Sequence, residues 1–322
     1  MRTPHLPAVL FCAWLAGCAA VPDEREATAP IDGRRLPAPD VELAIAGLGP
    51  CTDAADRTLH LDSRQPVNVL VHGCFSSAGR FRALAQVYAF QGQQAVCFSY
   101  DDRDRLSTSA AQLTAALAQL RRHTQSRDLT VIGHSQGGLV ARRALAGAAA
   151  DAIDADLRLV TISAPYAGIG VADHCGSRLL RVASLGLVAP ICHLVTGAKW
   201  SEIHFASRFI REPAALSPRV REFLKLETDE RDSCRRHDEH GDCREDDYVF
   251  SLAEQRQPAI DGRAPIMVQE VRAGHVEIVG NARTVPDKLI AILQQRGFLA
   301  ATEPERRVAF EALLQRLYLG EG

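Results

Sequence analysis

A short turn flanked by glycines, between an apolar segment and a helix-forming segment, constrains this chain more than any other feature. Residues 129–132, Leu-Thr-Val-Ile, predict a buried strand, and residues 139–145, Leu-Val-Ala-Arg-Arg-Ala-Leu, predict a helix. Between them lies Gly-His-Ser-Gln-Gly at 133–137, which matches the pattern G-x-S-x-G. Glycines lack a Cβ, so the backbones on either side of such a turn can approach closely. The segment therefore predicts a tight strand–turn–helix that presents Ser135 at the end of a sheet.

Strand-like and helix-like segments alternate on both sides of this turn. The expected strands are 67–71, 95–100, 129–133, 157–163, 222–226 and 265–271, and the expected helices are 80–91, 107–126, 136–150, 285–295 and 303–319. Such alternation is typical of a mostly parallel sheet with helices on both faces. With 322 residues, 47% of them hydrophobic, the chain has the length and composition of one α/β domain with insertions.

Two segments interrupt the alternation. Residues 166–220 mix Gly, Pro and apolar stretches, and they predict a helical cap inserted after the fourth strand. Its apolar run at 179–195 is typical of an acyl-binding groove, of a membrane-contacting surface or of a helix packed as core. Residues 228–247 are very polar and predict a surface loop.

The N-terminus has the pattern of an export signal. A short apolar run, Leu6–Leu15, follows Arg2 and is too short to span a bilayer. The next residues, Leu-Ala-Gly-Cys at 15–18, resemble the lipobox of bacterial lipoproteins. This resemblance implies a signal peptide at 1–17 and acylation of Cys18, and Ala19 then implies the outer membrane of the cell envelope. An ordinary signal peptide is the alternative. Residues 18–40 predict a flexible tether, and 41–322 the folded domain.

Cysteine usage agrees with export, because an oxidising compartment favours disulfides. Apart from Cys12 and Cys18, the chain has Cys51, Cys74, Cys97, Cys175, Cys192, Cys234 and Cys243. We expect the disulfides Cys175–Cys192 and Cys234–Cys243, each closing a short loop inside an insertion. Two histidines between Cys234 and Cys243 also fit a zinc site, but a disulfide-closed surface loop is favoured there. We therefore expect no metal and no cofactor. The net charge of −2 predicts no nucleic-acid partner.

A serine hydroxyl is a weak nucleophile and needs a general base. His275 follows the strand expected at 265–271 and precedes the helix expected at 285–295, so it lies on a loop at the end of the sheet. His134 and His72 are rivals by sequence proximity, but His134 should point away from the serine and His72 should make structural contacts. We therefore predict His275 as the base.

The oxyanion of an acyl-transfer reaction needs two backbone N–H donors. One donor is expected from Gln136, the residue after the nucleophile. The loop after the strand at 67–71, where Gly73 keeps the turn open, is expected to supply the other.

Taken together, these motifs resemble the α/β-hydrolase superfamily, and within it the bacterial triacylglycerol lipases and esterases, over residues 66–296. The resemblance rests on Val-His-Gly at 71–73, the turn and helix at 133–142, Thr-Ile-Ser-Ala-Pro-Tyr-Ala-Gly at 161–168, Ser-Arg-Phe-Ile at 207–210 and Gly-His at 274–275. It implies the α/β-hydrolase fold and the triad order Ser, acid, His. It also implies Cys74 as the second oxyanion donor.

The acid of the triad is harder to place, because the chain departs from the family by an insertion between Leu226 and Asp247. The acidic residues crowded there are Glu227, Asp229, Glu230, Asp232, Asp238, Glu239, Asp242, Glu245, Asp246 and Asp247. Asp-Tyr-Val-Phe-Ser at 247–251 resembles the lipase segment that carries the catalytic acid. We therefore predict Asp247, with Asp246 and Asp229 as alternatives.

Three functions remain open at this point. The first is a serine hydrolase that cleaves carboxylic esters, with an acyl-ester or lipid substrate and a membrane contact through the anchor at Cys18. The second is an acyltransferase or thioesterase on the same fold, in which the acyl group has a different acceptor or donor. The third is a non-catalytic lipoprotein of the cell envelope that uses the hydrolase scaffold for binding.

Overall fold

The structure is a computed structural model that describes residues 27–170, 197–263 and 265–320. The predicted signal peptide, Cys18 and the cap segment 171–196, with the predicted disulfide Cys175–Cys192, lie outside the described residues. Within the described residues, no helix is both long enough and apolar enough to cross a membrane.

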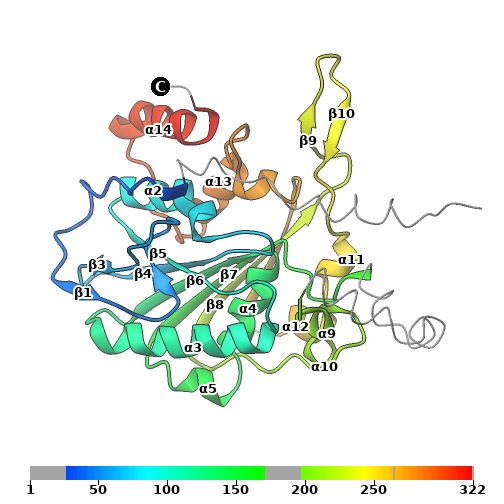
Figure 1. Ribbon diagram of the computed structural model, residues 1–322, viewed down its shortest axis with the longest axis horizontal. Coiled ribbons are helices and arrows are strands. Elements are labelled where there is room, and N and C mark those ends of the chain that lie inside the picture. The colour runs from blue at the N-terminus through cyan, green and yellow to red at the C-terminus, as the bar shows by residue number, and fades with distance from the viewer. Residues whose placement is uncertain (1–26, 171–196, 264, 321–322) are drawn as a thin grey trace, which may run out of the picture.

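Seven of the described strands form a sheet at the centre of the molecule (Figure 1). Its order is β11 (Ile266–Arg272), β8 (Val220–Asp229), β7 (Asp156–Ile162), β6 (Asp128–His134), β4 (Val67–Val71), β5 (Gln94–Phe98) and β2 (Leu48–Gly49). All neighbours pair in parallel except β2, which pairs antiparallel with β5 at the edge. The predicted α/β-hydrolase architecture, a mostly parallel sheet with helices on both faces, is confirmed.

Two layers of helices cover the sheet (Figure 1). One face carries α3 (Leu106–His123), α4 (Gln136–Ala144) and α5 (Ala148–Asp151), and the other carries α2 (Arg82–Phe90), α13 (Asp287–Gln295) and α14 (Arg307–Leu319). The helix predicted over 136–150 is interrupted at Gly147, which has a φ of 75°. The remaining short helices are η2 (Ala78–Phe81), α9 (Trp200–Ile203), α10 (Arg208–Arg211), α11 (Leu252–Gln255), α12 (Pro258–Asp261), η4 (Glu277–Val279) and η5 (Pro304–Arg306).

Strand β4 shows why the central strands are apolar on both sides. Val67, Val69 and Val71 belong to the core beneath α3 and α4, whereas Leu70 belongs to the core beneath α2 and α13. Side chains alternate across a strand, so a strand covered on both faces needs apolar residues at nearly every position. The polar exception, Asn68, donates its amide to the carbonyl of Gln94 at 2.9 Å.

The predicted tether at 18–40 differs from the structure, because residues from Ala27 onward pack on the domain. Ala27 is buried, and its carbonyl accepts the N–H of Asp53 at 2.8 Å. Asp32 and Gln86 of α2 exchange two hydrogen bonds, at 2.7 and 3.0 Å. A small two-stranded sheet, β1 (Val41–Leu43) with β3 (Leu59–Leu61), follows. In this structure, residues of the segment 27–40 therefore contact the domain.

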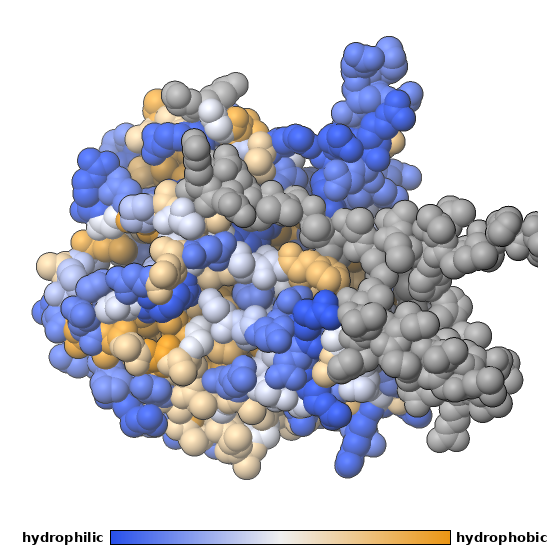
Figure 2. All heavy atoms as spheres, in the orientation of Figure 1, coloured by the Kyte–Doolittle hydropathy of each residue, from blue (hydrophilic) through white to orange (hydrophobic). Residues whose placement is uncertain are grey.

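The polar segment 228–247 is an ordered hairpin rather than an irregular loop. Strands β9 (Cys234–His237) and β10 (Cys243–Asp246) pair antiparallel, and the predicted disulfide Cys234–Cys243 joins them. The hairpin stands away from the domain and is covered with hydrophilic residues (Figures 1 and 2). A second disulfide, Cys51–Cys97, was not predicted.

Candidate active site

Ser135 lies in a strained turn between β6 and α4. Its φ of 56° and ψ of −128° place a non-glycine residue in a backbone region that costs on the order of 1–3 kcal/mol. The N–H of Ser135 donates to the carbonyl of Ile162 at the end of β7, at 2.8 Å. This bond to the neighbouring strand helps to hold the turn in the strained conformation.

Three glycines allow the backbone to pass close to this turn. A Cβ on Gly133 would collide with the backbone of Gly137, and a Cβ on Gly137 would collide with the carbonyl of Val71. A Cβ on Gly73 would lie 3.0 Å from the Cβ of Ser135 and 3.6 Å from its hydroxyl oxygen. The loop after β4 therefore packs directly against the serine.

The two predicted oxyanion donors belong to the two backbone segments that meet at Ser135. Gln136 is the first residue of α4, where backbone N–H groups have no acceptor within the helix. Its side-chain amide donates to the carbonyl of Asp102 at 2.9 Å, which fixes the residue in place. Cys74 directly follows Gly73, and its thiol is half-buried and outside the two disulfides.

His275 lies beside this turn, on the loop after β11. Its ring centroid is 4.7 Å from that of His134, the residue before the serine. The Nε2 of His134 donates to the carbonyl of His275 at 2.9 Å, and the edge of Phe250 packs on the His275 ring at 4.9 Å. The structure therefore brings together the predicted nucleophile loop and the predicted base loop.

The carboxylate that faces His275 belongs to Glu230. Its Oε1 lies 2.9 Å from Nδ1 of His275, and both side chains are buried. A carboxylate oxygen accepts hydrogen bonds, so Nδ1 carries a proton and Nε2 is left to accept one. The hydroxyl oxygen of Ser163 is also within hydrogen-bond distance of this Nδ1, at 2.8 Å.

Five hydrogen-bond donors surround the Glu230 carboxylate. Besides Nδ1 of His275, these are the hydroxyls of Ser163 and Thr228, at 2.6 and 2.8 Å, and the N–H groups of Val249 and Phe250, at 2.6 and 2.8 Å. Burial raises the pKa of Glu230. The charge of His275 and the hydrogen bonds from His275, Ser163 and Phe250 outweigh that effect and hold the pKa below its ordinary value. Glu230 is therefore a buried anion.

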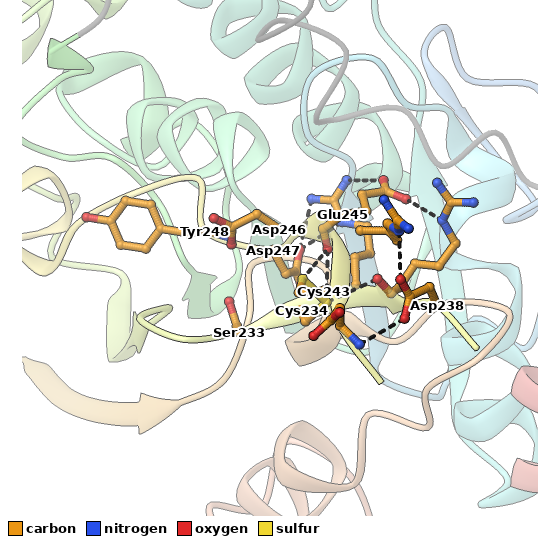
Figure 3. Close-up of a disulfide and its surroundings, with 12 residues drawn as sticks. Ser233, Cys234, Asp238, Cys243, Glu245, Asp246, Asp247 and Tyr248 are labelled. Carbon is orange, nitrogen blue, oxygen red and sulfur yellow. Dashed lines mark hydrogen bonds and ion pairs between the residues drawn. A yellow bond between two sulfur atoms is a disulfide. The ribbon is translucent and has the colours of Figure 1, made fainter. Parts of the chain in front are cut away.

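The structure differs from the prediction that Asp247 contacts the His275 ring. The Asp247 carboxylate accepts the N–H groups of Val276 and Glu277 at 2.9–3.0 Å and pairs with Arg235 at 2.8 Å. It therefore binds the backbone of the histidine loop. Of the two alternatives, Asp229 pairs with Arg231 at 2.6 Å. Asp246, which Figure 3 shows next to Asp247, accepts the N–H of Tyr248 at 2.9 Å.

Sequence reasoning missed Glu230 because β8 was expected to end at Leu226. The strand continues to Asp229, so Glu230 directly follows its carboxyl end. The charged residues in this stretch look like loop, but they are buried and paired: Lys225 binds Glu227 at 2.8 Å and Asp261 at 2.7 Å. A polar residue directly after a parallel strand is a common position for site residues, and that signal was available.

The two rival histidines have structural partners. His72 stacks on Tyr100 at 4.5 Å and hydrogen-bonds the carbonyl of Gly73 at 2.9 Å. Burial lowers the pKa of His72. Burial, together with the charges of His275 and Arg80, holds the pKa of His134 well below its ordinary value. Both rings are therefore neutral near pH 7.

A cleft of about 810 Å³ opens beside the loop after β4. His72 and Tyr100 form part of its wall, and Ser76 and Ser77 of the same loop form another part.

In the same loop, Phe75 is 40% exposed, and the ammonium of Lys199 lies 4.8 Å from the centre of its ring. The described residues hold no cluster of three or more potential metal ligands.

Comparison with known proteins agrees with this architecture. A family model described as the alpha/beta hydrolase family matches residues 69–315, which is well over half of the chain. No curated protein sequence matches the chain.

Among solved structures, the lipase BlEst2 of Bacillus licheniformis is similar in two forms. The mature form is 14% identical with a TM-score of 0.51, and the match covers 81% of this chain and 99% of that one. The propeptide form is 15% identical with a TM-score of 0.53, covering 83% and 55%. At this identity the likeness concerns the fold.

Proposed function

This chain belongs to the alpha/beta hydrolase family, and from that premise we propose that it is a serine hydrolase that cleaves carboxylic esters. Ser135 is the nucleophile, His275 the general base and Glu230 the acid that orients the base. Backbone N–H groups of Cys74 and Gln136 form the oxyanion hole. The predicted role of Asp247 as triad acid is replaced by Glu230.

In the first half-reaction, Nε2 of His275 takes the proton of the Ser135 hydroxyl while the serine oxygen attacks the carbonyl carbon of the ester. The carbonyl oxygen becomes an oxyanion, which accepts the N–H groups of Cys74 and Gln136. The imidazolium that forms is stabilised by the Glu230 carboxylate at Nδ1. His275 then gives its proton to the leaving alkoxide as the ester C–O bond breaks.

In the second half-reaction, water replaces the alcohol. His275 takes a proton from the water, whose oxygen attacks the acyl-enzyme carbonyl. The tetrahedral intermediate collapses, the bond to Ser135 breaks, and the serine oxygen regains a proton from His275. The products are a carboxylic acid and free enzyme, so neither metal nor cofactor is consumed.

One observation carries this proposal: the buried Glu230 carboxylate is hydrogen-bonded to Nδ1 of His275, and the His275 ring packs against His134, the residue before Ser135. A fluorophosphonate probe tests it, because such probes react with serines activated by a base. We expect wild-type protein to be labelled at Ser135 and Ser135→Ala to be unlabelled. Glu230→Gln should label far more slowly, whereas His60→Ala, which changes an exposed histidine, should label like wild type.

Labelling that persists unchanged in Ser135→Ala would refute the assignment. No labelling of wild type would favour the non-catalytic envelope lipoprotein. Activity on p-nitrophenyl esters of graded chain length separates an esterase from a lipase, because a short or long optimum reports the acyl site. Ester products that form when an alcohol is present would show acyl transfer instead of hydrolysis.

We also propose that the protein is exported and anchored through an acylated Cys18, at the outer membrane of the cell envelope. Ala27, nine residues further along the chain, is already packed on the domain. Nine residues span at most about 30 Å, so the anchor would hold the domain close to the lipid surface. Cys18→Ser should move the protein from the membrane fraction to the soluble fraction and abolish incorporation of a fatty-acid probe.

A further inference from the structure

Asp247 contacts three successive residues of the loop that carries the catalytic histidine. Its carboxylate accepts the N–H of Val276 through both oxygens, at 3.0 Å, and the N–H of Glu277 at 2.9 Å. Its backbone carbonyl accepts the N–H of His275 at 2.9 Å. Asp247 is only 1% exposed. The backbone of the histidine loop is therefore hydrogen-bonded to this one buried residue.

Gly274 allows the close approach. A Cβ at this position would collide with the carboxylate of Asp247. Gly274 is itself held, because its N–H donates to the Glu277 carboxylate at 2.9 Å, and that carboxylate also binds Lys288 at 2.6 Å. The histidine loop is thus wrapped around the Asp247 side chain.

Arg235 supplies the positive charge that a buried carboxylate needs. Its Nε donates to Oδ1 of Asp247 at 2.9 Å, and its Nη2 lies 2.8 Å from the same oxygen. The Arg235 side chain is 3% exposed, and it also lies 3.4 Å from Glu245. The Nε–H hydrogen bond gives this ion pair a direction, and the planar guanidinium supplies the charge.

The hairpin places both members of this pair. Arg235 follows Cys234 in β9, and Asp247 follows the last residue of β10. Asp246 is paired with Cys234 across the hairpin, and the disulfide to Cys243 joins the two strands (Figure 3). The hairpin that stands out from the domain is therefore connected at its base to the histidine loop.

We propose that Arg235 and Asp247 are positioning residues that hold the His275 imidazole against Glu230 for the reaction. The proposal rests on the proposed function, in which His275 is the base. Neither residue contacts the substrate. They act through the backbone of the loop, and a displacement of the base by about 1 Å reduces turnover by on the order of 100-fold.

The test compares Asp247→Asn, Arg235→Gln and the milder Arg235→Lys with wild type, in the full chain. The matched control is Arg244→Gln, which changes an exposed arginine of the same hairpin whose ion-pair partner is Asp238 and not the histidine loop. Activity on a p-nitrophenyl ester is normalised to the concentration of active serine. Proton NMR of histidine-labelled protein follows the low-field Nδ1–H of His275, assigned by its loss in His275→Ala.

We expect kcat to fall about 10- to 100-fold in Asp247→Asn and Arg235→Gln, with KM within twofold of wild type. The Nδ1–H resonance should broaden or disappear in both. Arg235→Lys keeps the charge but loses the planar geometry, so its kcat should lie between those of wild type and Arg235→Gln. This variant provides the test if Asp247→Asn and Arg235→Gln do not fold. Arg244→Gln should match wild type in both measurements.

Two results would overturn the proposal. One is a wild-type kcat and a wild-type resonance in Asp247→Asn and Arg235→Gln. The other is a loss in Asp247→Asn as large as in Glu230→Gln, together with full activity in Arg235→Gln, because Asp247 would then act as the acid itself. If wild type shows no esterase activity but the resonance changes as expected, the proposed function fails and the positioning of the imidazole stands.

Discussion

The hydroxyl of Ser163 lies 2.6 Å from Oε1 of Glu230, the same oxygen that faces His275. Ser163 directly follows β7, and Glu230 directly follows β8, so adjacent strand ends bring the two side chains together. Ser163 has a φ of 50°, and its N–H donates to the carbonyl of Leu226 at 2.9 Å. A strained residue is thus held where its hydroxyl reaches the buried carboxylate.

Ser163→Ala removes this hydroxyl and leaves the rest of the side chain in place. A hydrogen bond to a charged group contributes about 1.5–3 kcal/mol, so we expect kcat/KM for ester hydrolysis to fall about tenfold or more. The change should be smaller than that of Glu230→Gln, because the other donors to the carboxylate remain. An equal loss in the two variants would show that Ser163 does more than hold Glu230.

The lowered pKa of Glu230 makes stability depend on pH. An unfolded glutamate has a pKa near 4.5, and the folded one is lower, so the unfolded state binds more protons as the pH falls. The stabilisation is therefore fully present above about pH 5 and is lost as the pH drops through the folded-state pKa. Urea unfolding from pH 3 to 7 should show a steeper loss of unfolding free energy for wild type than for Glu230→Gln.

The control for this pH series is Glu239→Gln, whose side chain is exposed on the hairpin. It should follow wild type across the range. The opposite result is that the unfolding free energies of Glu230→Gln and wild type change in parallel from pH 3 to 7. In that case Glu230 does not take up the protons, and the assignment of an ionised carboxylate beside His275 is wrong.

The sheet and the serine turn were predictable because their signals are local. Apolar runs such as β4 report burial on both faces, and the glycines around Ser135 report a close backbone approach. The loop position of His275 followed from the strand before it and the helix after it.

The contact of Glu230 with His275 was not predictable, for a physical reason that concerns β8. Lys225 and Glu227 are charged, and charged residues in a sequence indicate a solvent-exposed segment. In the fold, however, they are buried and form an ion pair. The strand was therefore expected to end at Leu226, whereas it continues to Asp229, directly before Glu230. The sequence around Asp247 likewise does not show that its carboxylate binds Arg235 and the backbone of the histidine loop, because these partners meet it only in the fold.

The strain at Ser135 predicts opposite effects on activity and stability. Glycine adopts a φ of 56° without the cost that an L-residue bears, whereas alanine keeps that cost. Ser135→Gly and Ser135→Ala should both abolish labelling by a fluorophosphonate. Ser135→Gly should nevertheless unfold at the higher temperature, by on the order of 2 °C, for about 1 kcal/mol of relieved strain. Equal melting temperatures, measured by calorimetry, would contradict a strained turn.

The disulfides Cys51–Cys97 and Cys234–Cys243 should separate stability from turnover. Closing a loop of about 46 residues, as Cys51–Cys97 does, stabilises by about 4 kcal/mol in the chain-entropy model, against about 3 kcal/mol for the short loop of Cys234–Cys243. Replacing the first pair by serines should therefore lower the unfolding free energy more. Replacing the second pair should lower kcat several-fold, because Arg235 then loses its rigid hairpin. If both double variants keep the kcat of wild type well below their melting temperatures, the hairpin does not control the position of the histidine loop.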